Sequence, residues 1–563
     1  MLDLVADVLA QDGVDTIFGL VGGGNYALVT SLQHRLGLRF VAARHEAAAV
    51  SAADAYARLS GRLGVCTVTQ GPGFTHALTA LVESVKSRTP LVLLAGDMHS
   101  PGRSANQDID QNGLALLVGA DVCRIADPDE AEADVRAALS LARDSRRPVV
   151  VSLPIHVQDQ AAPGQAADPA PVLARQRAAP DGEALARAAE MLAGAQRPVV
   201  LAGRGAAVAG AGAALRSVGD QVGALLATTV MARGLFAGDP WDLDVCGGFS
   251  CRATARLVSE ADVVLAVGAS LNSWTTRHGE LLAGASVIHV DADPAAIGAL
   301  HPAVLGVVAD AAEVAEGLAH RLRTTTRQRL ACRTSQTLAT IRSGRPTPFE
   351  DAGTDDSIDP RTCMLELDRM LPRSRCVVVD GGHFSGFPVM YLTAPDLVSF
   401  TYAHGFQSVG LGLGNALGAA AAHPDRLTVA VIGDGGLMMT LGELDALRAL
   451  GQPVLVIVLN DAAYGAELHH FVGLGLPDTY ARLPPADFAA IARAHGASAL
   501  TVRQVSDMCA LEPWLADPDG LLLVDCKVNP EVKAEWLEHA FPASADPSQE
   551  QRAKRQRDRT RTA

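Results

Sequence analysis

Short runs of apolar, β-branched residues recur along the chain, and they constrain its fold more than any other feature. Examples are PLVLLAG at 90–96, PVVLAG at 198–203 and PVLVIVLND at 453–461. Ala-rich segments with the character of helices separate these runs. Strands that are apolar on both faces and alternate with helices are typical of parallel sheets covered on both sides. The pattern therefore predicts an α/β chain made of doubly wound parallel sheets.

Two polar, turn-rich segments divide this alternation into three parts. One covers residues 158–181, which are rich in Pro, Ala and charge, and the other ends in SGRPTPFEDAGTDDSIDP at 343–360. A chain of 563 residues has room for three or four domains at roughly 100–200 residues each. The predicted domains are residues 1–165, 182–335 and 358–540. The charged tail, 546–563, is expected to be disordered because it is poor in apolar residues.

The formal net charge of −15 argues against a nucleic-acid partner, which needs clustered Lys and Arg. The nine cysteines are scattered and odd in number, as expected of reduced thiols in a cytoplasmic protein. The segment 1–13 reads as an amphipathic helix with acids rather than a signal peptide. No apolar run reaches the roughly 18 residues needed to cross a membrane, so no membrane partner is expected.

Two acids follow neighbouring predicted strands late in the chain. Asp434 lies in VIGDGG and Asp461 ends VLVIVLND, 27 residues further on. Because ligands bind beyond the carboxyl ends of parallel strands, we expect these acids to face each other across a crevice. A helix from about Thr440 would point its N-terminus at the same space. Carboxylate and carbonyl oxygens suit Mg²⁺. The alternative is that both acids simply cap helices. The glycines that would let the backbone approach a ligand are Gly433, Gly435 and Gly436.

The spacing and the Asn-Asp ending of this segment resemble the signature of the thiamine-diphosphate (ThDP) enzyme family. The resemblance implies that Asp434, Asp461 and the main-chain carbonyl of Ala463 hold Mg²⁺. It places Tyr464 and the three glycines beside the cofactor. Asp461 stands where the commonest family pattern has Asn. The extra negative charge should make the site depend more strongly on its cation.

Two further segments resemble parts of the family's cofactor site. VVVDGGHFSG at 377–386 is similar to a segment that places Gly382 and His383 near the diphosphate; a surface histidine is the alternative. AHGFQSVGLGLGNALG at 403–418 is similar to the Gly-rich loop that bends the cofactor. The resemblance implies that Val409 props the cofactor and that the backbone of Gln407 contacts its 4′-amino group. Core packing is the alternative for Val409.

The segment FVAARHEAAAV at 40–50 places Glu46 at the start of a helix of small residues. The resemblance implies that Glu46 hydrogen-bonds N1′ of the aminopyrimidine and promotes the imino tautomer that deprotonates thiazolium C2. That chemistry needs a carboxylic acid in an apolar site. The alternative is an acid that interacts with the helix dipole. In the family, the N-terminal domain of one subunit meets the C-terminal domain of another, which implies a homodimer or homotetramer.

Residues 44–97 and 287–298 resemble the acetolactate synthase branch. The resemblance implies an enzyme that decarboxylates a 2-keto acid and ligates the carbanion to a second carbonyl, which forms an acyloin. One alternative is a 2-keto acid decarboxylase or C–C lyase on the same scaffold. From another class, the chain could be a catalytically silent cofactor-binding or regulatory subunit. The intact Glu46, Asp434 and Asp461 argue against a silent subunit.

The substrate side departs from that branch. By rough alignment, Ala466 and His470 replace its Met and Trp, and Asp110 replaces a Phe. The missing Trp argues against branched-chain biosynthesis. The backbone at Gly23 and Gly24 is a candidate for stabilising an oxyanion. Gln111 and His470 are candidates for polar contact or proton transfer. The other candidate pocket residues are Asn25, Gln70, His76, Asp110, Ala466 and His469. The alternative for His469 and His470 is a surface position on a helix.

The central segment resembles the domain that holds FAD in acetolactate synthase. SLNSWTTR at 270–277 and GFS at 248–250 depart from the family's FAD-contacting stretches. These departures argue against FAD. A fold that has lost its nucleotide, or one that holds an adenine nucleotide, fits as well.

Overall fold

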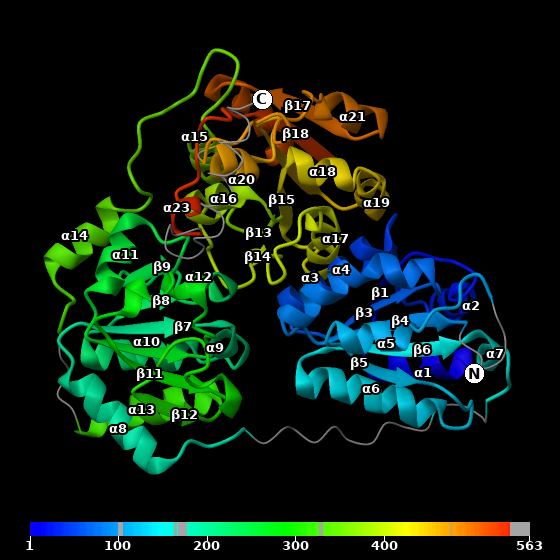
Figure 1. Cartoon of the computed structure of the whole chain (residues 1–563), viewed down its shortest axis with the longest axis horizontal. Coiled ribbons are helices and arrows are strands. Elements are labelled where there is room, and N and C mark those ends of the chain that lie inside the picture. Colours follow the sequence, from blue (N-terminus) through cyan, green and yellow to red (C-terminus); the bar gives the residue numbers. More distant parts are fainter. Residues whose placement is uncertain (99–104, 163–165, 167–176, 326–329, 473, 541–563) are drawn as a thin grey trace, which may run out of the picture.

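The computed structural model of the chain describes residues 1–98, 105–162, 166, 177–325, 330–472 and 474–540 (Figure 1). The tail 546–563 lies outside the described residues, so the prediction of disorder there stays a prediction. The described residues form three parallel sheets of six strands each, and helices flank each sheet. This confirms the predicted α/β fold of three doubly wound sheets. The sheets span residues 16–154, 198–308 and 375–527, each inside one of the three predicted domains.

The first sheet has the order β2-β1-β3-β4-β6-β5. Its strands are β1 (Thr16–Gly19), β2 (Arg39–Ala42), β3 (Gly64–Val68), β4 (Leu91–Asp97), β5 (Asp121–Arg124) and β6 (Pro148–Pro154). Its helices are α1 (Leu2–Gln11), α2 (Tyr26–Thr30), a π-helix (Ser31–Arg35), α3 (Glu46–Ser60), α4 (Pro72–Lys86), α5 (Gln111–Leu117), α6 (Ala131–Ser145) and α7 (Ile155–Gln158).

The central sheet has the order β12-β11-β10-β7-β8-β9. Its strands are β7 (Pro198–Ala202), β8 (Leu225–Thr228), β9 (Asp242–Val245), β10 (Val263–Val267), β11 (Ser286–Asp291) and β12 (Leu305–Val308). The accompanying α-helices are α8 (Gly182–Gly194), α9 (Arg204–Val208), α10 (Gly212–Val222), α11 (Arg252–Ser259), α12 (Ser273–Thr276), α13 (Ala311–Thr325) and α14 (Ser335–Ser343).

The third sheet has the order β14-β13-β15-β16-β18-β17. Its strands are β13 (Arg375–Val379), β14 (Phe400–Tyr402), β15 (Leu427–Gly433), β16 (Val454–Asn460), β17 (Ser498–Val502) and β18 (Leu521–Lys527). Its α-helices are α15 (Pro360–Met370), α16 (Gly386–Tyr391), α17 (Gly412–Ala422), α18 (Asp434–Met439), α19 (Glu443–Leu450), α20 (Gly465–Glu467), α21 (Phe488–Ala494), α22 (Glu512–Ala516) and α23 (Leu537–Ala540).

Burial explains the apolar runs of the sequence. Every residue of β4 and of β16 is buried, because helices cover both faces of each sheet. β4 pairs in parallel with β6, in a register that runs from Leu91 opposite Pro148 to Asp97 opposite Pro154. No helix among the described residues has the length and apolar character needed to cross a bilayer.

The first and third sheets share one strand order, and the helices that follow their edge strands β2 and β14 pack together (Figure 1). These helices are α3 and α17. A Cβ on Gly414 would lie 2.8 Å from Ala48 Cα, and one on Gly418 would lie 2.0 Å from the carbonyl oxygen of Ala52. The small residues of both helices therefore allow a very close approach. This contact joins the N-terminal and C-terminal domains within one chain.

The helix predicted from about Thr440 begins earlier. A short helix, α18, starts at Asp434 directly after β15, and a second, α19, starts at Glu443. Asp434 Oδ1 accepts the main-chain N–H of Gly435 at 2.8 Å, so this acid supports the first turn itself. Thr440 lies between the two helices with a non-helical backbone.

Candidate cofactor site

Two carboxylates lie together at the carboxyl ends of β15 and β16. Asp434 is 5% exposed, and its carboxyl group lies within hydrogen-bonding distance of that of Asp461. Burial raises the pKa of Asp434 to about 6. Burial and the neighbouring Asp434 raise the pKa of Asp461 to about 8. Two adjacent carboxyl groups, one buried and one half-buried, are a donor set that favours a bound cation, so the residues fit Mg²⁺.

The turn after β16 brings this pair close to a buried histidine. Ala462 adopts a positive φ of 51°, and Ala463 donates its N–H to Asp461 Oδ1 at 3.1 Å. A Cβ on Gly465 would lie 2.8 Å from His383 Nδ1 and 3.1 Å from Asp461 Oδ2. Glycine at 465 therefore keeps open the space where the acid and the imidazole meet.

His383 is 4% exposed, which contradicts the alternative of a surface histidine. Its Nε2 accepts the main-chain N–H of Ala534 at 2.7 Å, so the neutral ring carries its proton on Nδ1. Nδ1 has no hydrogen-bond partner within the described part of the chain. Burial, with His469 nearby, lowers the pKa of His383 to about 3. The site thus contains a buried donor without an acceptor, which fits a diphosphate oxygen. Gly382, before it, has a φ of 136° that favours glycine.

The Gly-rich loop lies against the same edge. Val409 is 40% exposed, and a Cβ on Gly436 would lie 3.2 Å from its Cγ1. Its exposure argues against the core-packing alternative. Asp380 accepts the N–H groups of Gly410 at 2.9 Å and Leu411 at 3.1 Å, which shapes the loop.

Two more features belong to this loop. Gln407 has a positive φ of 62°. Asp380 is 0% exposed, and burial raises its pKa to about 6. Sequence reasoning missed its role, although an acid directly after the strand in VVVDGG was an available signal. Tyr464 packs beside Gly435, where a Cβ would lie 2.8 Å from its ring.

Glu46 is the first residue of α3, and it is 7% exposed. His45 caps the helix because its Nδ1 accepts the N–H of Ala47 at 3.1 Å. Glu46 Oε2 lies 3.1 Å from His76 Nδ1. The other oxygen, Oε1, would lie 3.2 Å from a Cβ on Gly73. A buried acid with one oxygen beside a glycine fits the ring nitrogen of an aminopyrimidine. His76, expected in the substrate pocket, contacts this acid directly.

The loop after β1 is held by its own hydrogen bonds. Gly24 donates its N–H to Thr69 Oγ1 at 3.1 Å, so that group is already engaged. Asn25 is 1% exposed, accepts the N–H of Gly22 at 2.8 Å and donates to Leu20 and Thr67. A Cβ on Gly23 would meet nothing within 4 Å. The geometry therefore favours Gly23 over Gly24 for the expected oxyanion contact, and it gives Asn25 a role in shaping the loop.

Three other candidates support the same region. Gln70 donates to Gln107 at 2.8 Å. Gln111 is 1% exposed and donates to the carbonyl of Gly96 at 2.6 Å. Asp110 caps α5 by accepting the N–H of Gly113 at 2.8 Å. These contacts support a positioning role for Gln70, Gln111 and Asp110 rather than direct contact with a substrate.

Ala466, on α20 (Gly465–Glu467), and the two histidines after it follow the turn that carries Asp461. His469 and His470 belong to a π-helix (Leu468–Val472), and both are half-buried. The His469 ring centroid lies 4.5 Å from that of His383. His470 packs against Phe471 with ring centroids 4.8 Å apart. His469 thus extends the site from the diphosphate side toward the predicted substrate side.

Comparison with known families covers most of the chain. Residues 1–114 match the thiamine pyrophosphate enzyme N-terminal TPP binding domain. Residues 185–318 match the central domain of these enzymes, and residues 380–526 match the C-terminal TPP binding domain. The chain belongs to the thiamine pyrophosphate enzyme family. Curated relatives place it in the acetolactate synthase-like branch of that family, which confirms the resemblance seen in the sequence.

Three relatives illustrate this. The acetolactate synthase large subunit of Parasynechococcus marenigrum is 29% identical over 88% of this chain and 82% of its own. A probable 2-ketoarginine decarboxylase of Pseudomonas aeruginosa is 32% identical over 90% of this chain and 89% of its own. The chloroplastic acetolactate synthase 2 of Zea mays is 28% identical over 96% of this chain and 86% of its own.

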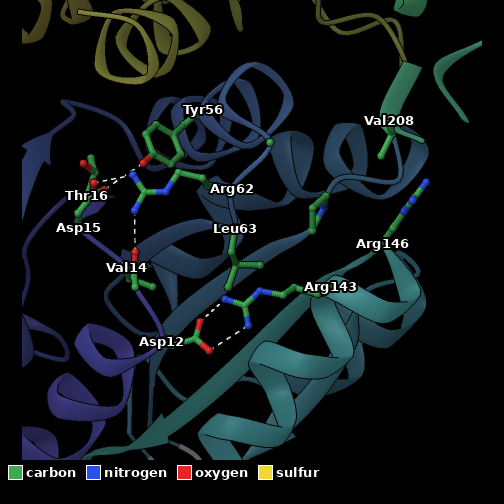
Figure 2. Close-up of a pocket in the computed structure, with 13 residues that line it drawn as sticks. Asp12, Val14, Asp15, Thr16, Tyr56, Arg62, Leu63, Arg143, Arg146 and Val208 are labelled. Carbon is green, nitrogen blue, oxygen red and sulfur yellow. Dashed lines mark hydrogen bonds and ion pairs between the residues drawn. The ribbon is translucent and has the colours of Figure 1, made fainter. Parts of the chain in front are cut away.

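A cavity of about 430 Å³ lies away from the family's cofactor residues, between the N-terminal domain and Val208 of α9 (Figure 2). Its charged walls are largely paired: Arg143 with Asp12, and Arg62 with Asp15 at 2.6 Å. None of the predicted site residues lines it. The cavity is therefore separate from the cofactor site.

Hydrogen bonds close the Gly-rich turn that follows β7 in the central domain. Gly203 donates its N–H to Val267 and Gly205 donates to Gly268, both at 2.9 Å. A Cβ on Gly203 would lie 2.2 Å from the Gly268 carbonyl oxygen. These two N–H groups bind the end of β10 and the residue after it, so they are not directed at a ligand.

Proposed function

We propose that this member of the family uses ThDP and Mg²⁺ to decarboxylate a 2-keto acid and to ligate the product carbanion to a second carbonyl. The observation that carries the proposal is the edge of the third sheet. There, the buried carboxyl group of Asp434 and the half-buried one of Asp461 lie beside a buried imidazole donor that has no acceptor among the described residues. The ligation step rests on the acetolactate synthase names of several relatives.

The chain's own residues have distinct tasks in this scheme. Asp434, Asp461 and the Ala463 carbonyl would hold Mg²⁺, and His383 Nδ1 would donate to the diphosphate. Val409 would hold the bent cofactor from below. Bound ThDP supplies the nucleophilic carbon and the electron sink. Glu46 would hold the proton that the aminopyrimidine shares, in a site from which water is largely excluded.

A simple decarboxylase is the second candidate. Ala466 and His470 stand where the acetolactate synthase pattern has Met and Trp, and the Trp contacts the second keto acid there. The 32% identity to a probable 2-ketoarginine decarboxylase also fits this alternative. In this reading a proton, rather than a second carbonyl, would end the reaction.

We infer a homodimer or homotetramer, located in the cytoplasm and without FAD. Large apolar side chains are exposed on the N-terminal and C-terminal domains, as expected of surfaces that a partner covers. They include Phe406 (46%), Met439 (57%), Tyr26 (65%) and Leu117 (83%). All nine cysteines are free thiols, which fits a reducing compartment. The departures at 248–250 and 270–277 from the family's FAD-contacting stretches support the absence of FAD.

Calorimetry and product analysis test the proposal. Apo-protein titrated with ThDP should take up the cofactor only when Mg²⁺ is present. The wild type should then release CO₂ from a 2-keto acid such as pyruvate and form an acyloin when an aldehyde or keto acceptor is added. An aldehyde product despite an acceptor would favour the decarboxylase. Cofactor uptake with no turnover of any keto acid would favour the silent subunit.

A further inference from the structure

His76 contacts the buried carboxyl group of Glu46 and is itself exposed at the surface of the chain. The Glu46 side chain is 9% exposed, whereas the His76 side chain is 56% exposed. Only 3.1 Å separates Glu46 Oε2 from His76 Nδ1, which is a hydrogen-bonding distance. The imidazole is therefore a bridge between the carboxyl group and the outside of the N-terminal domain.

A second histidine holds this bridge in place. The ring of His45 stacks on that of His76, with centroids 4.9 Å apart and planes 21° apart. His45 is itself fixed, because its Nδ1 accepts the N–H of Ala47 at the start of α3. One ring nitrogen of His45, one carboxylate oxygen of Glu46 and one ring nitrogen of His76 all lie within 4.8 Å of one another. The stack thus keeps His76 Nδ1 directed at Glu46.

The two oxygens of Glu46 face different neighbours. Oε2 faces His76, while Oε1 lies beside Gly73, where a Cβ would come within 3.2 Å. Glycine at 73 leaves Oε1 accessible to a ligand. Glu46 can therefore contact a ring nitrogen of the cofactor through Oε1 and keep its contact with His76 through Oε2.

We propose that His76 relays protons between Glu46 and water. The proposal rests on the proposed function. Glu46 needs to gain and lose a proton when it serves the aminopyrimidine of ThDP, and it has no such need otherwise. On the outward step, the proton on Oε2 moves to Nδ1 while the proton on Nε2 leaves to water. On the inward step, water supplies a proton to Nε2 and the Nδ1 proton moves to Oε2. One outward and one inward step return the ring to its starting tautomer.

The side chain placed at position 76 distinguishes a proton relay from a residue that only holds Glu46 in position. An imidazole takes up a proton at one nitrogen while it releases one from the other, whereas a carboxamide only donates and accepts hydrogen bonds. His76→Gln can therefore keep a hydrogen bond to Glu46 without carrying a proton. His76→Ala removes both the hydrogen bond and the relay, and it leaves a space that free imidazole can enter.

The test uses the full-length protein loaded with ThDP and Mg²⁺. Calorimetry measures ThDP affinity, and exchange of the cofactor C2 proton in D₂O, followed by quenching and NMR, measures the step that depends on Glu46. We expect H76Q and H76A to bind ThDP like the wild type but to exchange at least about tenfold more slowly. Imidazole should restore H76A in proportion to its concentration and should not restore H76Q. His34→Gln, at an exposed position on the π-helix, is the control and should exchange normally.

A readout without cofactor completes the test. In the ¹⁵N-histidine spectrum of the apo-protein, Glu46→Gln should shift the Nδ1 resonance of His76. Wild-type exchange rates in both His76 variants would overturn the relay, as would an equal slowing that imidazole does not relieve in H76A. Failure of the wild type to take up ThDP would overturn the proposed function, and the relay with it. Normal uptake with normal exchange in both variants would overturn the relay alone.

Discussion

Glu83 accepts the main-chain N–H of Phe406 through Oε2 at 2.6 Å, across 323 residues of sequence. The same carboxylate accepts the N–H of Gly405 at 2.9 Å and pairs with Arg58 at 3.0 Å. Burial opposes ionisation, yet Arg58 and the two N–H groups hold the pKa of Glu83 below its usual range. A charge on α4 of the N-terminal domain therefore shapes the Gly-rich cofactor loop of the C-terminal domain in the same chain.

Glu83→Gln should weaken both the fold and the cofactor loop. The change removes one of the two carboxylates that pair with Arg58, whose side chain is 7% exposed; Asp54, at 2.6 Å, is the other. Losing the charge-assisted hydrogen bonds of a buried carboxylate costs about 2 kcal/mol of unfolding free energy. Urea denaturation measures this loss, and calorimetry should show weaker ThDP binding. Glu132→Gln, which breaks a more exposed pair with Arg136, should cost less than about 1 kcal/mol. Equal losses in the two variants would contradict the role given to Glu83.

Gly418→Ala should disturb the contact between α3 and α17. A Cβ there would lie 2.0 Å from the main-chain oxygen of Ala52, and backbone cannot move aside cheaply. Such overpacking costs about 2 kcal/mol. The matched control is Gly194→Ala on α8, where a Cβ meets nothing within 4 Å, so the stability should not fall. Thermal unfolding of both variants checks the difference, and a harmless Gly418→Ala would show that the helices are not so close.

Asp461→Asn should raise the stability of the apo-protein and lower its affinity for the cation. Asn keeps a ligand oxygen but removes the repulsion between two adjacent acids that are shielded from water, so the apo-protein should melt at a higher temperature. The gain in melting temperature on adding Mg²⁺ and ThDP should shrink, because weaker binding stabilises less. Asp519→Asn, at an exposed position, should change neither quantity. A lower apo melting temperature in Asp461→Asn would oppose this account.

Glu443 should make stability depend on pH. This side chain is 1% exposed and accepts the N–H of Arg44 at 2.9 Å, and burial raises its pKa from 4.5 to about 7. Between these values the unfolded chain has released the proton while the folded chain keeps it. The folded state binds more protons, so unfolding free energy falls as pH rises through this window.

Glu443→Gln removes this dependence. Relative to the variant, the wild type should lose about 3 kcal/mol between pH 4.5 and pH 7. Urea denaturation at several pH values measures the change. Glu130→Gln, at an exposed position, serves as the control and should follow the wild type. A constant difference between wild type and Glu443→Gln at all pH values would show that Glu443 does not titrate in this way.

The parts of the site that sequence could predict are local. Asp434 and Asp461 follow apolar strands, so parallel-sheet geometry alone brings them to one edge. Glu46 is predictable because it opens a helix of small residues in a motif that resembles a known family. The apolar runs predicted the three sheets for the same reason, since each run needs only its own neighbours to indicate a buried strand.

The parts that sequence could not predict depend on contacts between distant segments. Glu83 meets Phe406 only because two domains pack through α3 and α17, and no local pattern marks that pairing. The sequence predicts His76 in the substrate pocket, whereas packing of α4 beside α3 places it on Glu46. Asp380 shapes the loop that carries Val409, which depends on how the segments after β13 and β14 fold back on each other.

Paired variants of two subunits test the central claim, that Glu46 of one chain and Asp434 of another serve one cofactor. Glu46→Gln and Asp434→Asn chains with different tags are co-expressed and purified through both tags. If the site is shared, one of the two sites in each mixed dimer keeps both residues. C2-proton exchange of bound ThDP should then reach about half the wild-type value per dimer, although each variant alone is inactive. If each site lies within one chain, both sites of the mixed dimer are damaged, and the absence of exchange would contradict the account.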